Sequence, residues 1–329
     1  MPGPEMRRAM AEAELGDDVF GEDPTVNRLQ EVAAERLGKE AALFVASGTM
    51  GNLLGVLVSA RSGQEIIADA DSHVFLSEAA GAATLGGIQV MPVHTEAGVL
   101  TPEQVADAIR TEDDHHPRTA AVTFEDTHNY HGGVAWPLEA LRAASDEAHR
   151  NGLAVHLDGA RLFNAALASG TGVDELAACA DTVSFCLSKG LGAPAGSVLC
   201  GPAESIAEAR RWRKMLGGGM REIGMLGAAG LFALDNMVDR LAEDHANART
   251  LAEGLAEIEG VGIDLSRVQT NLVIYELDSM PVEAFLMECA KRGVKGGAVG
   301  RKKARFVTHY GVTAADVQQA LLVVEEVLA

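Results

Sequence analysis

Basic and aromatic residues are both scarce in this sequence. The 27 Lys and Arg residues stand against 47 Asp and Glu residues, which gives a formal net charge of −20. A chain this acidic repels nucleic acid and anionic lipid, so we expect neither as a partner. Aromatic residues make up 4% of the chain and hydrophobic residues 47%. The core must therefore be mainly aliphatic, and an anionic ligand would bind only where the few cations gather.

Cysteine is scarce as well, and long apolar runs are absent. No run reaches the ~18 apolar residues of a membrane span, and the first residues show no apolar signal region. A chain of 329 residues does not need disulfide staples, and none of its cysteines forms a CxxC pair. We therefore expect a cytoplasmic protein without a metal site, in which the thiols are reduced and buried. These thiols are Cys179, Cys186, Cys200 and Cys289.

Short apolar runs alternate with helical patterns over the first two thirds of the chain. This alternation predicts an α/β fold with a mostly parallel, doubly wound sheet. Beyond Gly217-Gly218-Gly219 the pattern changes to Ala- and Leu-rich helices with short strands and a last helix that begins after Thr313. We expect a large domain over residues 1–230 and a smaller α/β domain over residues 231–329. The expected strands of the large domain are 41–46, 65–68, 88–93, 119–124, 153–157, 182–187 and 197–200.

Polar residues follow several of these expected strands, at the edge where ligands bind in parallel α/β sheets. Ser47, Gly48 and Thr49 follow the first strand and precede a helix. Backbone N–H groups at such a helix start can bind a phosphate, although the same residues are equally suited to a simple helix cap. Lys189 and Asp158 follow two adjacent strands and are 31 residues apart, about one βαβ unit.

The pairing of Asp158 and Lys189 is more specific than either residue alone. A buried carboxylate needs a partner, and Arg161 could serve as a purely structural one. A lysine withdrawn from water becomes a usable amine nucleophile, although most lysines lie on the surface. Together they match the requirements of pyridoxal 5'-phosphate (PLP): an amine for the Schiff base and a carboxylate for the ring nitrogen.

Two histidines and two basic clusters are further candidates. His73 and His128 follow strands and could move a proton, or could be ordinary loop histidines; Glu125 and Asp126 could orient His128. Two clusters of Lys and Arg residues occur, at 210–221 and at 301–305. Each could bind an anion or form a solvated face. Of the second cluster, we expect only Arg305 to point inward.

Seven motifs in a fixed order resemble the low-specificity L-threonine aldolases over nearly the whole chain. The resemblance implies a PLP-dependent fold of the aspartate aminotransferase type (fold type I). It also implies a carbon–carbon lyase, usually a homotetramer built as a dimer of dimers with shared active sites. The motifs are GDDVFGEDPTVN (16–27), SGTMGN (47–52), EDTHN (125–129), HLDGARLFNA (156–165), CLSKGLGAPAGS (186–197), RWRKMLGGGMR (211–221) and RFVTH (305–309).

The resemblance also implies roles for individual residues at the cofactor. Lys189 would hold PLP as a Schiff base, Asp158 would pair with the ring nitrogen, and His73 would stack on the ring. Gly48 and Thr49 would bind the phosphate, next to Ser47.

Other residues would act on the substrate or approach from another subunit. Arg161, which also lies among the cofactor contacts, and Arg305 would hold the substrate carboxylate. Lys214 and Arg221 would reach the cofactor from the partner subunit. His128 would lie near the β-hydroxyl, and either it or His73 could be the base.

The implied reaction is the cleavage of L-threonine, L-allo-threonine and related β-hydroxy-α-amino acids to glycine and an aldehyde. Alternatives are another PLP-dependent lyase or racemase of the same fold, or a PLP-binding protein with poor catalysis.

Two departures from the family pattern matter. The usual first segment, DLRSDTVTRP, is not present, and a chain lacking its serine should bind amino acids more weakly. Phe20 stands where the family often has Tyr, which removes a hydroxyl.

Overall fold

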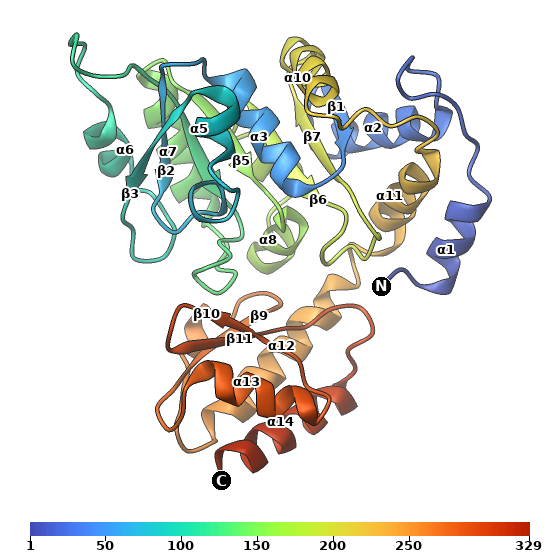
Figure 1. Ribbon diagram of the computed structural model, residues 1–329, viewed down its shortest axis with the longest axis vertical. Coiled ribbons are helices and arrows are strands. Elements are labelled where there is room, and N and C mark those ends of the chain that lie inside the picture. The colour runs from blue at the N-terminus through green and yellow to red at the C-terminus, as the bar shows by residue number, and fades with distance from the viewer.

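The computed structural model describes all residues from Met1 to Ala329, arranged as a larger body and a smaller one (Figure 1). The larger body is built on a seven-stranded sheet in the order β1-β7-β6-β5-β4-β2-β3. All of its strands run parallel except β7, which is antiparallel to both neighbours. The strands are β1 (Ala41–Val45), β2 (Glu65–Asp69), β3 (Gln89–Val93), β4 (Thr119–Glu125), β5 (Ala154–Asp158), β6 (Thr182–Cys186) and β7 (Ser197–Gly201). The predicted doubly wound α/β sheet is confirmed.

Helices cover this sheet and bury a core of 41 residues, most of them aliphatic. The helices have capping residues at the expected places: Asp23 accepts hydrogen bonds from the backbone N–H groups of Thr25 and Val26 and so starts α2. The helices are α1 (Pro4–Ala11), α2 (Pro24–Arg36), α3 (Gly48–Ser59), α4 (His73–Leu76), α5 (Gly81–Gly86), α6 (Pro102–Ala108), α7 (Leu138–Arg150), α8 (Leu162–Ser169), α9 (Val173–Ala177), α10 (Ala203–Met215) and α11 (Gly224–Asn236).

The smaller body is a four-stranded antiparallel sheet in the order β10-β11-β9-β8, with helices on one face. Its own core holds 15 buried residues. The capping box of Thr313 and Asp316 starts the last helix where the sequence predicts it. The elements are α12 (Leu241–Ala256), β8 (Val261–Gly262), η1 (Leu265–Arg267), β9 (Leu272–Leu277), α13 (Val282–Lys291), β10 (Gly297–Val299), β11 (Lys303–Val307) and α14 (Ala314–Leu328).

The division into two domains stays a proposal, and packing argues for a later boundary than the expected one after residue 230. That residue lies inside α11, and the buried side chains Ala229, Ala233 and Leu234 of α11 all belong to the first core. The first core extends to Leu241, whereas the second begins at Ala248. We therefore place the boundary within α12, the helix that runs from one body into the other (Figure 1).

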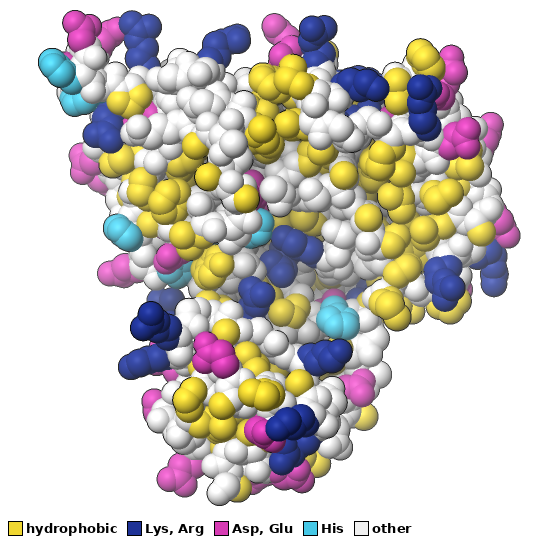
Figure 2. Space-filling view, in the orientation of Figure 1, with side chains coloured by type: hydrophobic (Ala, Val, Ile, Leu, Met, Phe, Trp, Pro, Cys, Tyr) yellow, Lys and Arg dark blue, Asp and Glu magenta, His cyan; other side chains and the backbone are white.

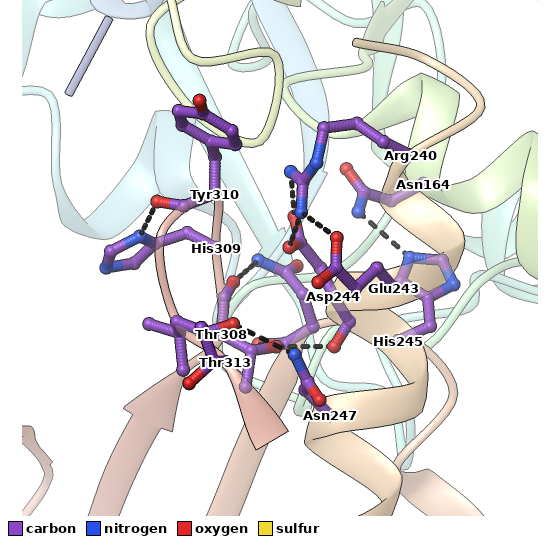
Figure 3. Close-up of polar contacts among 12 residues, drawn as sticks. Asn164, Arg240, Glu243, Asp244, His245, Asn247, Thr308, His309, Tyr310 and Thr313 are labelled. Atoms are coloured by element: carbon purple, nitrogen blue, oxygen red, sulfur yellow. Dashed lines mark hydrogen bonds and ion pairs between the residues drawn. The ribbon is translucent and has the colours of Figure 1, made fainter. Parts of the chain in front are cut away.

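Polar contacts tie α12 to both bodies (Figure 3). The hydroxyl of Thr308, just after β11, donates to the carbonyl oxygen of Asp244 at 2.6 Å. The guanidinium of Arg240 forms an ion pair with the Asp244 carboxylate, also at 2.6 Å. On the other side, Asn164 of α8 contacts His245 at 3.0 Å. These contacts fix the end of β11 relative to the larger body, and β11 carries Arg305.

None of the helices combines the length and the hydrophobicity needed to cross a membrane. The four cysteines are free and buried, as predicted.

Candidate active site

The carboxyl ends of β5 and β6 bring Asp158 and Lys189 to one edge of the sheet. Asp158 is the last residue of β5 and pairs in register with Ser184 of the adjacent, parallel β6. Lys189 follows the end of β6 by three residues and is half-buried. The two residues are therefore not on opposite edges of the sheet.

The Asp158 carboxylate is 2% exposed and is held by neutral donors. Its Oδ2 accepts a hydrogen bond from the amide of Asn52 at 2.7 Å, and its Oδ1 accepts from the backbone N–H of Ala160 at 3.0 Å. The purely structural alternative of a pair with Arg161 is not observed, since Arg161 instead contacts Asn129. A buried carboxylate with only neutral partners is suited to binding a protonated ring nitrogen.

Asn52 connects this carboxylate to a second one, that of Glu78. The Asn52 amide also donates to Glu78 at 2.8 Å, and the same Glu78 oxygen lies 2.9 Å from Nδ1 of His73. The Asn52 carbonyl oxygen accepts from the hydroxyl of Ser184 at 2.6 Å, which fixes the orientation of the amide. A continuous chain of contacts therefore runs from Asp158 through Asn52 and Glu78 to His73.

The pKa values of Glu78 and His73 are both raised, but for different reasons. Burial raises the pKa of Glu78. The hydrogen bond from His73 to Glu78 raises the pKa of His73, and Asp158 and Glu125 add to this effect. Glu125 also accepts the backbone N–H of His73 at 2.6 Å. His73 is thus held at both its backbone and Nδ1, while its side chain stays 29% exposed.

His128 lies deeper than His73 and has a different partner from the expected ones. Its side chain is fully buried, and its Nε2 lies 3.1 Å from a carboxylate oxygen of Asp69 at the end of β2. The suggestion that Glu125 or Asp126 orients His128 is wrong, because Asp69 makes the ring contact. The opposite ring nitrogen, Nδ1, has no hydrogen-bond partner. Burial by itself lowers the pKa of His128, but the hydrogen bond to Asp69 and the charges of Glu125, Asp69 and Asp71 together raise it above its ordinary value.

Two guanidinium groups from different bodies of the molecule meet at one neutral oxygen. Arg305 of β11 donates to the amide oxygen of Asn129 at 2.9 Å, and Arg161 approaches the same oxygen at 3.4 Å. Nε of Arg161 is buried without a partner, and burial together with the nearby Arg305 lowers the pKa of Arg161. Two cations sharing a neutral acceptor form a site for a carboxylate. Figure 2 shows Lys and Arg side chains in the recess between the two bodies.

The start of α3 has the features of a phosphate site. Ser47 caps this helix and accepts the backbone N–H of Met50 at 3.2 Å. A Cβ at Gly48 would lie 2.7 Å from Sγ of Cys186, so only glycine fits against β6. Ser197 has a buried hydroxyl without a partner, 3.7 Å from the same position. Free N–H groups at a helix start and an unpaired hydroxyl suit a phosphate.

Lys214 and Arg221 lie outside the Asp158 network. Arg221 forms an ion pair with Asp17, and its guanidinium lies 5.5 Å from the ring centre of Phe20. The Phe20 side chain is 70% exposed. No contact joins either residue to the Asp158 network within one chain, so their approach from a partner subunit stays a prediction.

The residues of this edge fit PLP: an unpaired Arg161 nitrogen, a cradle that admits only glycine, and an amine and a carboxylate on adjacent strands. A mostly parallel α/β sheet with these residues at its carboxyl edge defines the class as PLP-dependent enzymes of fold type I. Comparison with known proteins agrees. The family described as Beta-eliminating lyase matches residues 1–279.

Relatives match over the full length of the chain. A probable low-specificity L-threonine aldolase 2 of Arabidopsis thaliana is 42% identical, covering 99% of this chain and 94% of the relative. The low specificity L-threonine aldolase of Escherichia coli K12 is 44% identical, covering 95% of this chain and 92% of the relative. A crystal structure of a putative L-allo-threonine aldolase from Listeria monocytogenes has the same fold, with a TM-score of 0.84 at 21% identity, covering 100% and 95%. The chain belongs to the threonine aldolase group of the beta-eliminating lyase family, and its cofactor is PLP.

Sequence reasoning missed the residues that hold the predicted ones. Asn52, Glu78, Asn129 and Asp69 each contact a predicted side chain. Two of them lie inside quoted motifs, Asn52 at the end of SGTMGN and Asn129 at the end of EDTHN, which was the available signal.

Proposed function

We propose that this protein is an aldehyde-lyase that cleaves L-threonine, L-allo-threonine and related β-hydroxy-α-amino acids to glycine and an aldehyde. The observation that carries the proposal is the pair of guanidiniums, Arg161 and Arg305, meeting on neutral Asn129 at the edge that holds Asp158. An amino acid carboxylate fits between them and gains two charge-assisted hydrogen bonds. The names of the full-length relatives specify the reaction.

PLP supplies the electron sink when Lys189 holds it at this edge. Asp158 keeps the ring nitrogen protonated, and Asn52 fixes the direction of that carboxylate through its 2.7 Å contact. The first turn of α3, from Gly48 and Thr49 with Ser47, takes the phosphate.

His73 is the base that we propose for the β-hydroxyl proton. Its Nδ1 is occupied by Glu78, so Nε2 is the nitrogen left to accept a proton. Its side chain is 29% exposed, whereas that of His128 is fully buried. His73 is therefore the more accessible of the two histidines for a substrate, and the same ring would stack on the cofactor. His128, held by Asp69, supports the loop that carries Asn129.

Replacing Lys189 with Ala tests the proposal. We expect K189A to lose both the visible absorption of bound PLP and the release of aldehyde from L-threonine, because no other amine at this edge replaces Lys189. Lys295, a lysine of the small domain, gives the control variant K295A, which should keep both signals. Pyruvate as the product of the wild-type protein, instead of aldehyde, would show a β-eliminating enzyme of a different kind.

We also propose that the protein works as a cytoplasmic homotetramer, a dimer of dimers. The buried free thiols suit a reducing compartment. Arg221 makes its contacts outside the Asp158 network of its own chain, which supports a site completed by a partner subunit.

A further inference from the structure

Two histidines and a carboxylate form a second polar cluster in the loops next to the active site. Asp69 is the last residue of β2, and His128 and His131 lie in the loop that follows β4. One ring nitrogen of each histidine and one carboxylate oxygen of Asp69 all lie within 4.8 Å of one another. The two rings pack edge to face, with their centres 4.6 Å apart. We name these three residues the Asp69 cluster.

The contact between Asp69 and His128 has the spacing of two ligands on one metal ion. Nε2 of His128 lies 3.1 Å from Oδ1 of Asp69, and zinc bonds of about 2.0–2.1 Å place neighbouring ligands of a tetrahedral site ~3.4 Å apart. Both groups are held in place from outside the cluster. Oδ2 of Asp69 accepts the hydroxyl of Thr95 at 2.6 Å, and the ring of His128 packs directly on Gly98, where a Cβ would lie 2.3 Å from it.

Hydrogen bonds within the cluster leave two ring nitrogens unused. Nδ1 of His128 and Nε2 of His131 are buried without a hydrogen-bond partner. A carboxylate oxygen of Asp71 lies 3.4 Å from this Nε2. Buried polar atoms are almost always paired, so an unpaired imidazole nitrogen beside carboxylates suits a cation as its partner. The Asp71 side chain is 53% exposed, which gives an ion a path from solvent.

The types of ligand and their charge select a first-row divalent cation. Imidazole nitrogen together with carboxylate oxygen is typical of zinc sites, whereas Mg²⁺ and Ca²⁺ prefer oxygen ligands. Asp69 and Asp71 supply two negative charges, which match the charge of one divalent ion. Arg267, a basic residue that acts on His131, has its own carboxylate partner in Asp264 at 3.4 Å.

We propose that Asp69, His128 and His131 bind one Zn²⁺ ion, with Asp71 beside the fourth position. This assignment replaces the expectation of no metal site, which rested on the cysteines. His73 follows Asp71 by two residues, and Asn129 lies between the two histidines. The ion therefore joins the two loops that carry His73 and Asn129, and its role is structural. The site does not depend on which reaction the enzyme catalyses.

The zinc content of the PLP-loaded protein tests this assignment. Wild-type protein that is treated with a chelator, equilibrated with ZnCl2 and freed of unbound ion should retain one zinc per chain, as measured by inductively coupled plasma mass spectrometry. H131Q and D69N each remove one ligand. Each should weaken zinc binding by more than the ~10- to 100-fold that the loss of a residue supporting a ligand costs. ZnCl2 should also raise the Tm of the wild type but not that of H131Q, and visible absorption shows which variants keep PLP.

His149 provides the matched control. Its ring faces a carboxylate at a similar distance, that of Asp181 at 3.2 Å, but it belongs to no group of three possible ligands. H149Q should keep the zinc. The other such group, His73, Glu78 and Asp158, lies at the cofactor and is the same in every variant.

The comparison has outcomes that contradict the proposal. Equal zinc contents in the wild type, H131Q and D69N, or no retained zinc in the wild type, would overturn it. A loss in H149Q as large as that in H131Q would do the same, because it would show that zinc binds to histidines without regard to the Asp69 cluster. If H131Q does not retain PLP, D69N alone decides between these outcomes.

Discussion

Asn52 links the carboxylate of Asp158 to that of Glu78, the partner of His73. Its amide donates to Asp158 at 2.7 Å and to Glu78 at 2.8 Å. Each is a hydrogen bond to a charged acceptor, worth about 1.5–3 kcal/mol. The orientation of the ring-binding carboxylate and that of His73 therefore depend on one neutral side chain.

The variant N52A should lose turnover while keeping the cofactor. Removing the amide leaves Asp158 and Glu78 buried without their shared donor, and we expect kcat for L-threonine to fall about 10- to 100-fold, as the loss of one such hydrogen bond predicts. Visible absorption should still report bound PLP, because Lys189 is intact. The exposed Asn236 provides the control N236A; a kcat for N52A equal to that of N236A would remove Asn52 from the mechanism.

Glu78 sets the pH at which His73 can act. The hydrogen bond to Glu78 is the largest effect that raises the pKa of His73, followed by the charges of Asp158 and Glu125. A base must be neutral, so activity rises as the pH rises through the pKa of His73. In E78Q that pKa falls, and the acid limb of the kcat/KM profile for L-threonine should move to lower pH.

The position of that limb is the measurement, because a general loss of packing would lower kcat/KM without moving it. Glu139 on α7 has an 84% exposed side chain, and E139Q serves as the control. A limb that stays in place in E78Q would assign the proton transfer to a group other than His73.

The sequence predicts the roles of residues whose own side chains are charged or reactive. Asp158, Lys189 and Arg161 carry charges at or just after strand ends, and Arg305 is a charged residue within an apolar strand. Asn52 and Glu78 are ordinary in the sequence, because their contacts join residues 106 and 26 positions apart. Only folding makes such partners neighbours, so the supporting network follows from the three-dimensional packing.

At the scale of elements, β5 carries an ionisable group into the centre of the sheet. His156 is fully buried, with its ring nitrogens 2.9 Å from the hydroxyl of Thr182 and 3.3 Å from the amide oxygen of Asn52. Burial lowers the pKa of His156 to about 4. The folded strand therefore keeps this ring neutral at pH values where the unfolded chain would protonate it.

Acid should consequently destabilise the fold through β5. Below the unfolded pKa of 6.5 the unfolded state binds a proton that the folded state takes up only near pH 4, so His156 stabilises the fold above pH 6.5 and progressively loses that effect as the pH falls towards 4. This contribution amounts to at most about 1.4 kcal/mol per pH unit. Denaturant unfolding at pH 6.5 and 5 should show a larger loss of stability for the wild type than for H156Q.

Other ionisable groups respond to acid in both variants, so the difference between the two is the quantity that matters. The exposed His94 gives the control H94Q, which should behave like the wild type. Identical losses in H156Q and the wild type would show that His156 is not held neutral in the fold.

The strands of the large sheet were more predictable than their directions. All seven expected runs form strands, because short apolar runs between turn residues have few alternatives inside a core. The antiparallel direction of β7 follows from its connection: only residues 187–196 separate it from β6, too few for the crossover that a parallel neighbour needs. Helix α1 was not expected, since a single buried residue, Met6, marks its apolar side.

At the scale of the whole molecule, the active site depends on how the two bodies are held. Arg305 reaches Asn129 from the small domain, and its strand is anchored three residues later by the bond from Thr308 to Asp244 on α12 (Figure 3). The sequence predicts that Arg305 points inward. It does not predict the meeting with Arg161, since that depends on the angle at which α12 joins the bodies.

Subunit mixing tests whether active sites are also shared between chains. K189A lacks the cofactor lysine, and R221A lacks the cation that we expect to act in the partner's site, so each variant alone should be nearly inactive. In a mixed dimer, one site has Lys189 from one chain and Arg221 from the other, and is intact. Random reassembly makes half of the dimers mixed, so mixing should restore about one quarter of wild-type activity if the two-fold interface contributes residues to both sites.

Reassembly after mild denaturation, followed by the aldehyde assay, measures this recovery. Mixing K189A with D158A gives the matched control. Each chain supplies both Lys189 and Asp158 to its own site, so in a mixed dimer one site lacks Lys189 and the other lacks Asp158. No site is complete, and no activity should return. Recovery in the first mixture but not in the second places Arg221 in the partner's active site. If R221A is fully active alone, the ion pair with Asp17 is the whole role of Arg221, and each chain completes its own site.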